Sequence, residues 1–328
     1  DGATYIGATL FEFTNKTGVT AYAVKEGTKR IAWRAMKNTG CQNIKQLTLP
    51  STLKEIGQYA FANMSALETL DIPNSVKSLS VDILRDCTSL KELHIGTGLE
   101  SIDTWSYSRS MFGPTPKLTT LTVDPANPYY RSYNNRLIRR ADDTLLEIAQ
   151  GTIQGDVVID NVRRVNVLAM YTLVGADVTV TFGPDVEYID PQIGNYQHSA
   201  VHVKSYHVNS ASPYYLATDG FLIRRADSTL IAAPVLHISE DGELSLPAAI
   251  ARTSLLWDAS YTKLTLHAIG HIDINEPTAS FCWPDKLVLS YPCVSTITIA
   301  GKPLSEALSE IKGLISVDPY GGTYANGT

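Results

Sequence analysis

Long hydrophobic runs, cysteine and clustered basic charge are all scarce in this chain of 328 residues. No apolar run has the about 20 residues that a membrane-spanning helix needs, so we expect no membrane span within the chain. Lysine and arginine number 27 against 33 acidic residues, and the formal net charge is −6. The arginine pairs are scattered and no long basic run offsets this balance, so nucleic acid is not expected as a partner.

The motifs of common enzyme classes are also missing. The chain has no G-x-S-x-G, no phosphate-binding P-loop and no G-x-G-x-x-G dinucleotide motif. His267 and His271 stand four residues apart, but they follow a predicted strand and enclose a glycine, whereas a metal pair at this spacing needs a helix. Paired carboxylates such as Asp142 and Asp143 fall in predicted turns, where aspartate serves local hydrogen bonding. We expect no catalytic residue, no metal site and no cofactor.

Four cysteines are too few for a disulfide framework in a chain of this length. Cys41 and Cys87 are separated by twice the 23-residue repeat described below, which places their strands two steps, or about 9.6 Å, apart. A disulfide spans a Cα separation of at most about 7 Å. Both are therefore predicted to be buried thiols, with Met64 in the unit between them. Cys282 and Cys293 could pair, and connectivity cannot be decided from sequence.

A 23-residue repeat organises the chain. Leu47–Leu90 holds two copies that match at nearly every apolar position, with Leu47 aligned to Leu70 and Phe61 to Leu84. The same spacing recurs between Val157 and Val180 and between Leu264 and Leu287. A fixed period of this length is typical of a solenoid, in which each unit buries its apolar side chains only by stacking on its neighbours.

Within one unit, the alternation of apolar and polar residues predicts a strand at 47–49 that ends at Pro50, because proline cannot donate to a sheet. Gly57 then allows a sharp bend. Residues 58–63 are long enough for a helical turn that directs Phe61 inward. The unit is thus expected to form one coil of a solenoid.

A longer repeat of 85 residues lies over the short one. Asp124–Ala149 aligns with Asn209–Pro234, and both contain Pro-Tyr-Tyr followed by Leu-Ile-Arg-Arg-Ala-Asp. Each segment is predicted to be a β-hairpin, because Asn134-Asn135 and Asp219-Gly220 tolerate the positive φ of tight hairpin turns.

The two ends of the chain depart from the repeat. Residues 1–26 are predicted to be an N-terminal cap, residues 27–300 the solenoid, and residues 301–328 a C-terminal capping helix and tail. Pro303 suits the first position of a helix over 303–311 that carries one apolar stripe. The glycine-rich segment 320–328 is expected to be disordered.

The order of these features resembles the BspA-like leucine-rich repeat family of bacterial surface proteins. Leu49-Pro50, Ile56-Gly57, Tyr59-Ala60-Phe61 and Cys87-Thr88-Ser89-Leu90 carry the resemblance, which departs from the family pattern at Asp82-Ile83-Leu84. The predicted fold is an α/β, β-rich repeat solenoid. It is expected to be a right-handed leucine-rich-repeat superhelix with short strands, short helical turns and two inserted β-hairpins.

The resemblance implies an exported protein, extracellular or on the cell surface and usually held by a lipid anchor outside this chain. It implies adhesion or binding to a protein or glycan ligand rather than catalysis. The chain begins at Asp1 without methionine, so we expect a mature or trimmed form. Two alternatives stay open: a structural spacer or assembly module without its own ligand, and an enzyme with a deep pocket of convergent polar groups.

The candidate ligand contacts are surface positions between buried strand residues. Alternation along the strands places them on one face of a sheet, and solenoids bind through such extended faces. These positions are Thr48, Asp71, His94, Thr122, Val158, Thr181, His207, Thr265 and Val288. A solvated face rich in strand-favouring threonine is the alternative that we favour.

Two tyrosine pairs complete the candidates. Tyrosine is common at recognition surfaces, so Tyr129, Tyr130, Tyr214 and Tyr215 are further candidate contacts. The alternative, again favoured, is that these rings pack the hairpin bases onto the coil.

Overall fold

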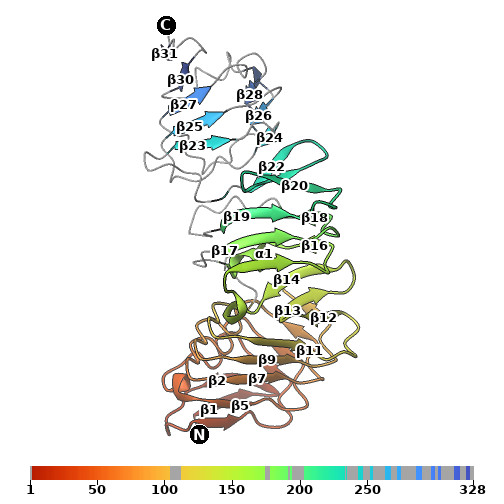
Figure 1. Cartoon of the computed structure of the whole chain (residues 1–328). Coiled ribbons are helices and arrows are strands. Elements are labelled where there is room, and N and C mark those ends of the chain that lie inside the picture. The colour runs from red at the N-terminus through yellow and green to blue at the C-terminus, as the bar shows by residue number, and fades with distance from the viewer. Residues whose placement is uncertain are drawn as a thin grey trace. The chain divides into compact units, whose positions relative to one another are not determined.

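The chain forms two compact units, which are described separately (Figure 1). Unit 1 comprises residues 1–154 with 162–173, and unit 2 comprises residues 155–161 with 174–328. The computed structural model describes residues 2–103, 112–173, 178–190, 193, 203–232 and 234, and then the backbone of nine strands between residues 243 and 325. The extra residues around Trp105 lie in part outside the described residues.

Unit 1 is a β-solenoid built on two sheets that run through successive coils. Sheet A contains β1 (Ala3–Ile6), β2 (Thr9–Phe13), β4 (Arg30–Ile31), β6 (Glu55–Ile56), β8 (Ser78–Leu79) and β10 (Ser101–Ile102). Sheet B contains β3 (Ala21–Ala23), β5 (Gln46–Thr48), β7 (Thr69–Ile72), β9 (Glu92–Ile95) and β11 (Thr120–Val123). All neighbours in both sheets are parallel except β1 and β2. Both parallel sheets therefore extend into residues 9–23 of the expected cap.

The core lies between the strands of each coil, where the alternating pattern places its apolar residues. In the best-preserved coil Leu53, Ile56, Phe61 and Leu67 are 0–1% exposed. Burying one such side chain contributes about 1.5–3 kcal/mol, and no single coil can bury them alone. Stacking is therefore required for stability.

Helix is almost absent from the described residues, which corrects the expectation of an α/β solenoid with helical turns. Residues 58–63 form consecutive turns, with positive φ at Tyr59 (58°) and Asn63 (65°). The described helices are α1 (Val167–Tyr171) and two 3-10 turns at Cys41–Asn43 and Gln150–Thr152. Left-handed residues interrupt the i→i−4 hydrogen bonds that a helix needs, so the fold is a β-solenoid of stacked coils.

A third sheet in unit 1 contains the first inserted hairpin. Its strands in unit 1 are β12 (Tyr130–Tyr133), β13 (Arg136–Arg139), β14 (Thr144–Ile148) and β16 (Arg164–Val165). β12 and β13 are antiparallel and are joined by Asn134 and Asn135, whose φ angles are 48° and 57°. Two consecutive positive φ values define the tight hairpin turn that matches strand twist.

Unit 2 repeats the same kind of architecture. Its first sheet contains β15 (Asp156–Ile159), β17 (Val178–Phe182) and β19 (Val203–Val208), all parallel. The second hairpin joins β20 (Tyr215–Thr218) to β21 (Phe221–Arg224) through Asp219 and Gly220, again with positive φ. Its sheet continues through β22 (Thr229–Ala232), β24 (Arg252–Thr253), β26 (Ile272–Ile274), β28 (Ile297–Ile299) and β29 (Lys302–Pro303).

The C-terminal segment differs from the expected helix and tail where it is described. A further sheet contains β23 (Glu243–Leu246), β25 (Lys263–Leu266), β27 (Lys286–Leu289), β30 (Leu314–Val317) and β31 (Thr323–Ala325). Pro303 ends β29 instead of beginning a helix, and β31 lies within the segment expected to be disordered. The rest of the expected helix, residues 304–311, lies outside the described residues.

The prediction for the first two cysteines is confirmed. Cys41 and Cys87 are free and buried, and Met64 of the coil between them is fully buried. Burial raises the pKa of the Cys87 thiol to about 12. Cys282 and Cys293 lie outside the described residues. Within the described part of the chain, no helix is long and apolar enough to cross a membrane.

Candidate functional site

The outward face of sheet B aligns four of the predicted surface residues. Strand pairing places Asp71 beside His94 and His94 beside Thr122, and Thr48 stands at the equivalent position of β5. The flanking Leu70, Ile72 and Leu93 are buried, whereas Thr48 and Asp71 are exposed and His94 and Thr122 are half-buried. The period-2 alternation of the strands produces this ladder directly.

Three members of the ladder line one open groove. The groove has a volume of about 640 Å³ at the end of sheet B next to the hairpin. Its lining consists of Asp71, Ile72, Pro73, Asn74, His94, Ile95, Gly96, Thr122, Val123, Asp124, Pro125 and Ser132. Thr48 does not belong to it.

Two contacts hold the imidazole of His94. Its Nδ1 lies 2.6 Å from Thr122 Oγ1 on the next strand, and its Nε2 lies 3.5 Å from Glu92 Oε2 on its own strand. Glu92 and His94 are two residues apart, so they share one face of β9. The ring is thereby fixed across the floor of the groove, with Asp71 on its other side.

Two features position the walls of the groove: the close approach of Gly96 to Asn74, and the first hairpin. A Cβ atom at Gly96 would lie 2.5 Å from Asn74 Oδ1, and that oxygen accepts a 2.9 Å hydrogen bond from the Thr97 amide. On the other side, Ser132 Oγ accepts a 3.0 Å hydrogen bond from the Val123 amide. The hairpin thus satisfies a donor of edge strand β11 that would otherwise be open to another strand.

A second, smaller cluster of predicted residues lies in unit 2. Thr181 of β17 pairs with His207 of β19 and with Val158 of β15. His207 is exposed, Val158 is 47% exposed and Thr181 is half-buried. Thr265 of β25 pairs with Val288 of β27. The predicted positions therefore lie on three separate sheets, one in unit 1 and two in unit 2.

Each tyrosine pair has one exposed and one buried member. Tyr129 is 46% and Tyr214 39% exposed, whereas Tyr130 is 4% and Tyr215 2% exposed. The burial of Tyr130 and Tyr215 favours the alternative that these two rings pack the hairpin bases, because alternation at the hairpin base turns the second ring of each pair inward. The hydroxyl of Tyr215 accepts a 2.9 Å hydrogen bond from the Ile189 amide.

The arginine pairs of the two hairpins are used structurally. Arg139 binds both carboxylate oxygens of Asp142, at 2.9 and 2.8 Å, and Arg224 binds Asp227 in the same way. Arg140 donates from Nε to the carbonyls of Asn127 and Tyr130. The hydrogen bond from Arg139 is the main cause that lowers the pKa of Asp142 to about 2. The shared Arg-Arg-Ala-Asp motif therefore stabilises the hairpins through ion pairs and hydrogen bonds.

Three polar residues that line the groove were not among the predicted contacts. Asn74 and Asp124 follow strands in turns, and Ser132 lies in β12. The sequence signal for Asn74 and Asp124 was their position in the turn after an apolar strand, which is equally typical of ordinary turns. No group of three or more His, Cys, Asp or Glu residues within the described residues could hold a metal ion.

Stacked parallel strands, a continuous apolar core and an exposed β-face define a β-solenoid repeat protein. Residues 4–126 match a protein-family model, the BspA type leucine rich repeat region, in six copies. The resemblance predicted from the sequence is therefore confirmed over residues 4–126. No curated protein matches the chain.

Solved structures of bacterial repeat proteins are similar at low identity. The pneumococcal vaccine antigen PcpA is 13% identical, with 90% of this chain and 82% of that chain covered and a TM-score of 0.46. A leucine rich cell surface protein from Faecalibacterium prausnitzii A2-165 is 15% identical, with 95% and 89% covered and a TM-score of 0.43. A leucine-rich repeat protein from Eubacterium ventriosum ATCC 27560 is 12% identical, with 86% and 72% covered and a TM-score of 0.43.

Proposed function

We propose that this chain is a non-catalytic extracellular or cell-surface binding protein, and that the groove beside Asp71, His94 and Thr122 holds a segment of a protein partner. The BspA-type repeat region supports the location and the binding role. The observation that carries the proposal is the convergence of these three ladder residues with Asp124 in one groove.

The charge of the groove selects the chemistry of the partner. Asp71 and Asp124 contribute two carboxylates, and Glu92 lies beside His94 at the rim. The lining contains no lysine or arginine, and its one basic side chain, His94, already contacts Thr122. An incoming lysine or arginine would form charge-assisted hydrogen bonds with the two carboxylates. The partner segment is therefore basic.

A protein segment fits this groove better than a glycan. The lining has no phenylalanine, tyrosine or tryptophan ring on which a sugar could stack. It does have short apolar stretches at Ile72-Pro73 and Val123 next to polar groups, the mixture that recognition sites use.

Selection from a displayed random peptide library on the purified chain tests the proposal. We expect enrichment of peptides with lysine or arginine, and at least about tenfold weaker binding to the Asp71→Asn/Asp124→Asn variant, because each charged contact contributes about 1.5–3 kcal/mol. The matched control is Asp156→Asn/Asp185→Asn, which removes two exposed carboxylates in unit 2.

Equal loss in the control variant would attribute binding to net charge and refute the groove as the site. Enrichment of neutral peptides only would refute the basic partner. Absence of any saturable peptide, together with saturable binding on a glycan array, would favour a glycan ligand. Absence of both would favour the structural spacer.

A further inference from the structure

A cluster of cations and aromatic rings lies on the turns of the first coils, away from the groove. It consists of Trp33, Arg34, Lys37, Tyr59 and Arg85, and is called the cation–aromatic cluster below. The Arg34 guanidinium carbon lies 4.2 Å from the centroid of the Trp33 ring and 5.5 Å from that of Tyr59. Lys37 Nζ lies 5.6 Å and the Arg85 guanidinium carbon 5.9 Å from the Tyr59 ring centroid. Three cations thus surround one ring.

The register of the coils assembles this cluster. Arg34, Tyr59 and Asp82 occupy the same left-handed position in consecutive coils, with φ of 57°, 58° and 59°. The Arg34 amide donates a 3.1 Å hydrogen bond to the Gln58 carbonyl and so joins the first two coils. Lys37 and Arg85 each stand three residues after this position. The stacking repeat therefore presents the cluster as one surface over three coils.

The cluster is exposed, and most of its charge has no acidic partner. Trp33 is 58% exposed, and Arg34 and Arg85 are exposed. Elsewhere in unit 1, cations pair with carboxylates of adjacent coils, as Lys91 does with Glu68 at 2.8 Å and Arg30 with Glu55 at 2.6 Å. In the described part of the chain, Arg34 and Lys37 have no such ion pair, and Arg85 approaches only Asp86, at 3.6 Å.

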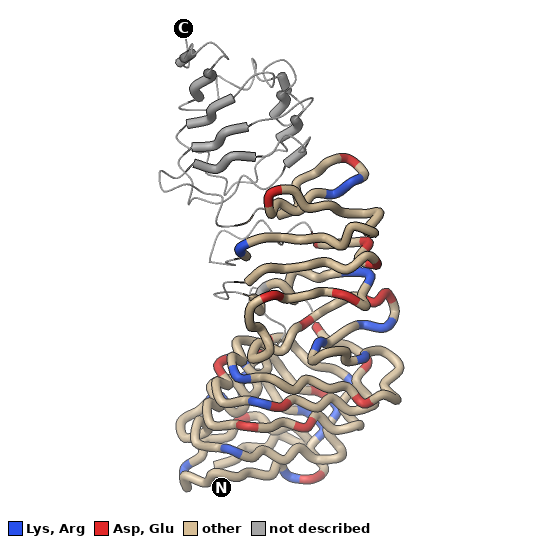
Figure 2. The backbone as a smooth tube through the Cα atoms, in the orientation of Figure 1, with Lys and Arg blue, Asp and Glu red and all other residues tan. Residues whose placement is uncertain are grey.

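Among the described residues, the Arg34 side chain contacts two rings and makes no hydrogen bond or ion pair, so its donors are available. A guanidinium stacked against a ring uses its flat face, while its N–H groups point outward in the plane. Stacking also restrains the side chain, so less conformational entropy is lost when those groups bind an anion. Figure 2 shows basic and acidic residues interspersed along unit 1, whereas in this cluster three cations have, within the described part of the chain, one nearby ion-pair partner, Asp86 beside Arg85.

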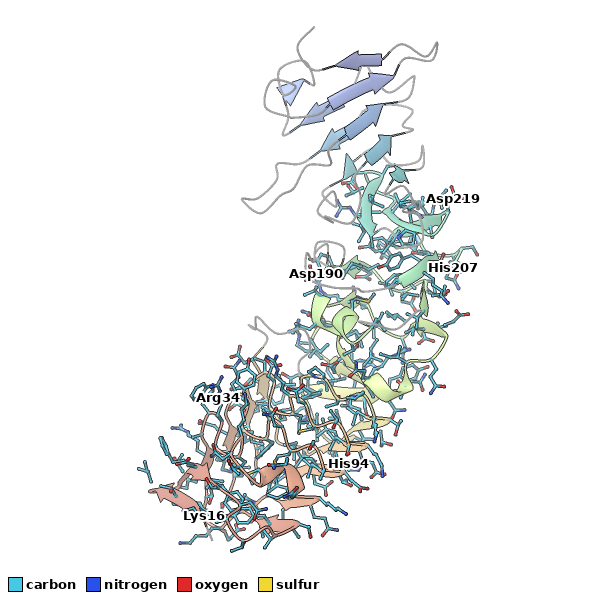
Figure 3. All side chains as sticks on the ribbon, turned by 90° about the vertical axis from the view of Figure 1, so that its left-hand side faces the viewer. Lys16, Arg34, His94, Asp190, His207 and Asp219 are labelled. Atoms are coloured by element: carbon cyan, nitrogen blue, oxygen red, sulfur yellow. The ribbon has the colours of Figure 1, made fainter. Side chains whose placement is uncertain are left out.

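We propose that the cation–aromatic cluster binds an anionic glycan. Sulfate or carboxylate groups of the glycan accept hydrogen bonds from Arg34, Lys37 and Arg85. The exposed Trp33 ring supplies an apolar face for a sugar ring, which distinguishes this ligand from a simple anion. Figure 3 shows Arg34 and His94 on opposite sides of unit 1, so the cluster and the groove are separate sites.

Binding of the full chain to heparin, measured by isothermal titration over a series of salt concentrations, tests this proposal. We expect saturable binding that weakens at least about tenfold in Arg34→Gln/Lys37→Gln, with a salt dependence reduced by about one to two in the log–log slope, as for the loss of two charged contacts. The matched control is Lys16→Gln/Lys54→Gln, which removes two exposed lysines outside the cluster and should weaken binding less than about twofold.

A second variant separates a sugar from a general polyanion. Trp33→Ala retains every charge and alters a side chain that is mostly in water, so the protein should stay folded and bind heparin about fivefold more weakly, with an unchanged salt slope. No heparin binding by the wild-type chain, or equal weakening in the lysine control, would overturn the site. Equally tight binding of polyglutamate, unaffected by Trp33→Ala, would overturn the assignment to glycans.

Discussion

The buried side-chain amide of Asn127 links the first hairpin to the solenoid. It is 1% exposed, and its Nδ2 donates to the carbonyls of Gly96 at 3.0 Å and Leu99 at 3.2 Å. Its Oδ1 accepts from the amides of Tyr129 and Tyr130, both at 2.8 Å. All four hydrogen-bonding positions of one buried amide group are therefore occupied.

Replacing Asn127 by alanine should destabilise the hairpin region by about 4 kcal/mol. Four hydrogen bonds are lost at about 1 kcal/mol each, and the backbone groups left behind stay buried. Asn127→Ser should cost about half as much, because the second hairpin uses Ser212 at this position. There the Ser212 hydroxyl oxygen accepts from the amides of Tyr214 and Tyr215, at 3.3 Å each. Serine thus keeps the two accepted bonds and loses the two donated ones.

Native-state hydrogen exchange is the suitable assay, because coils of a solenoid can open separately and a single unfolding transition is not assured. For Asn127→Ala, protection of the amides between residues 129 and 139 should fall by about three orders of magnitude, at 1.4 kcal/mol for each factor of ten. A fall of less than tenfold, or equal effects of alanine and serine, would refute the assignment of hairpin stability to this amide.

Three further predictions concern the ion pair, the thiol and the tightest glycine. Asp142→Asn should cost about 1 kcal/mol at pH 7, since its pair with Arg139 is about one-third exposed. The pKa of Asp142 is lowered, so the difference between wild type and variant in urea denaturation should be full above about pH 5 and shrink as pH falls toward 2; a difference independent of pH would contradict it. With a pKa of about 12, Cys87 should not react with iodoacetamide at pH 8 until urea unfolds the chain; rapid labelling of Cys87 in the folded protein, located by peptide mass spectrometry, would contradict its burial. Gly98→Ala would place a Cβ atom 1.9 Å from the Asn74 carbonyl oxygen and should cost about 1–3 kcal/mol in the same denaturation assay; a neutral effect would show that the two coils can separate freely.

The features that depend on nearest neighbours in sequence were predictable. Alternation placed Leu47 and Leu70 inside and Thr48 and Asp71 outside, and the structure agrees. The 23-residue period predicted which strands would be adjacent, because in a solenoid each unit contacts only the next. The same period placed the Cys41 and Cys87 thiols two repeat steps apart, with one coil between them.

Local propensity was misleading where the turns are tight. Residues 58–63 contain alanine, phenylalanine and glutamine, which permit a helical turn, but the positive φ of Tyr59 and Asn63 ends any helix. These angles follow from stacking, since amides of this turn donate to carbonyls of the following coil, as Phe61 does to Ile83 and Asn63 to Arg85. A stacked turn favours such inter-coil bonds over helical ones.

The sequence by itself determined the repeat, the burial pattern, the two hairpin turns and the ladder of exposed strand residues, because each depends on spacing along one chain. Only the tertiary structure decided which exposed residues meet. Asp71 and Asp124 share a groove because Asp124 directly follows β11, which lies two strands from β7 in sheet B. Trp33 and Arg85 join one cluster because three turns stack with the same φ. Distances across coils are set by packing and register, and no local pattern in the sequence encodes them.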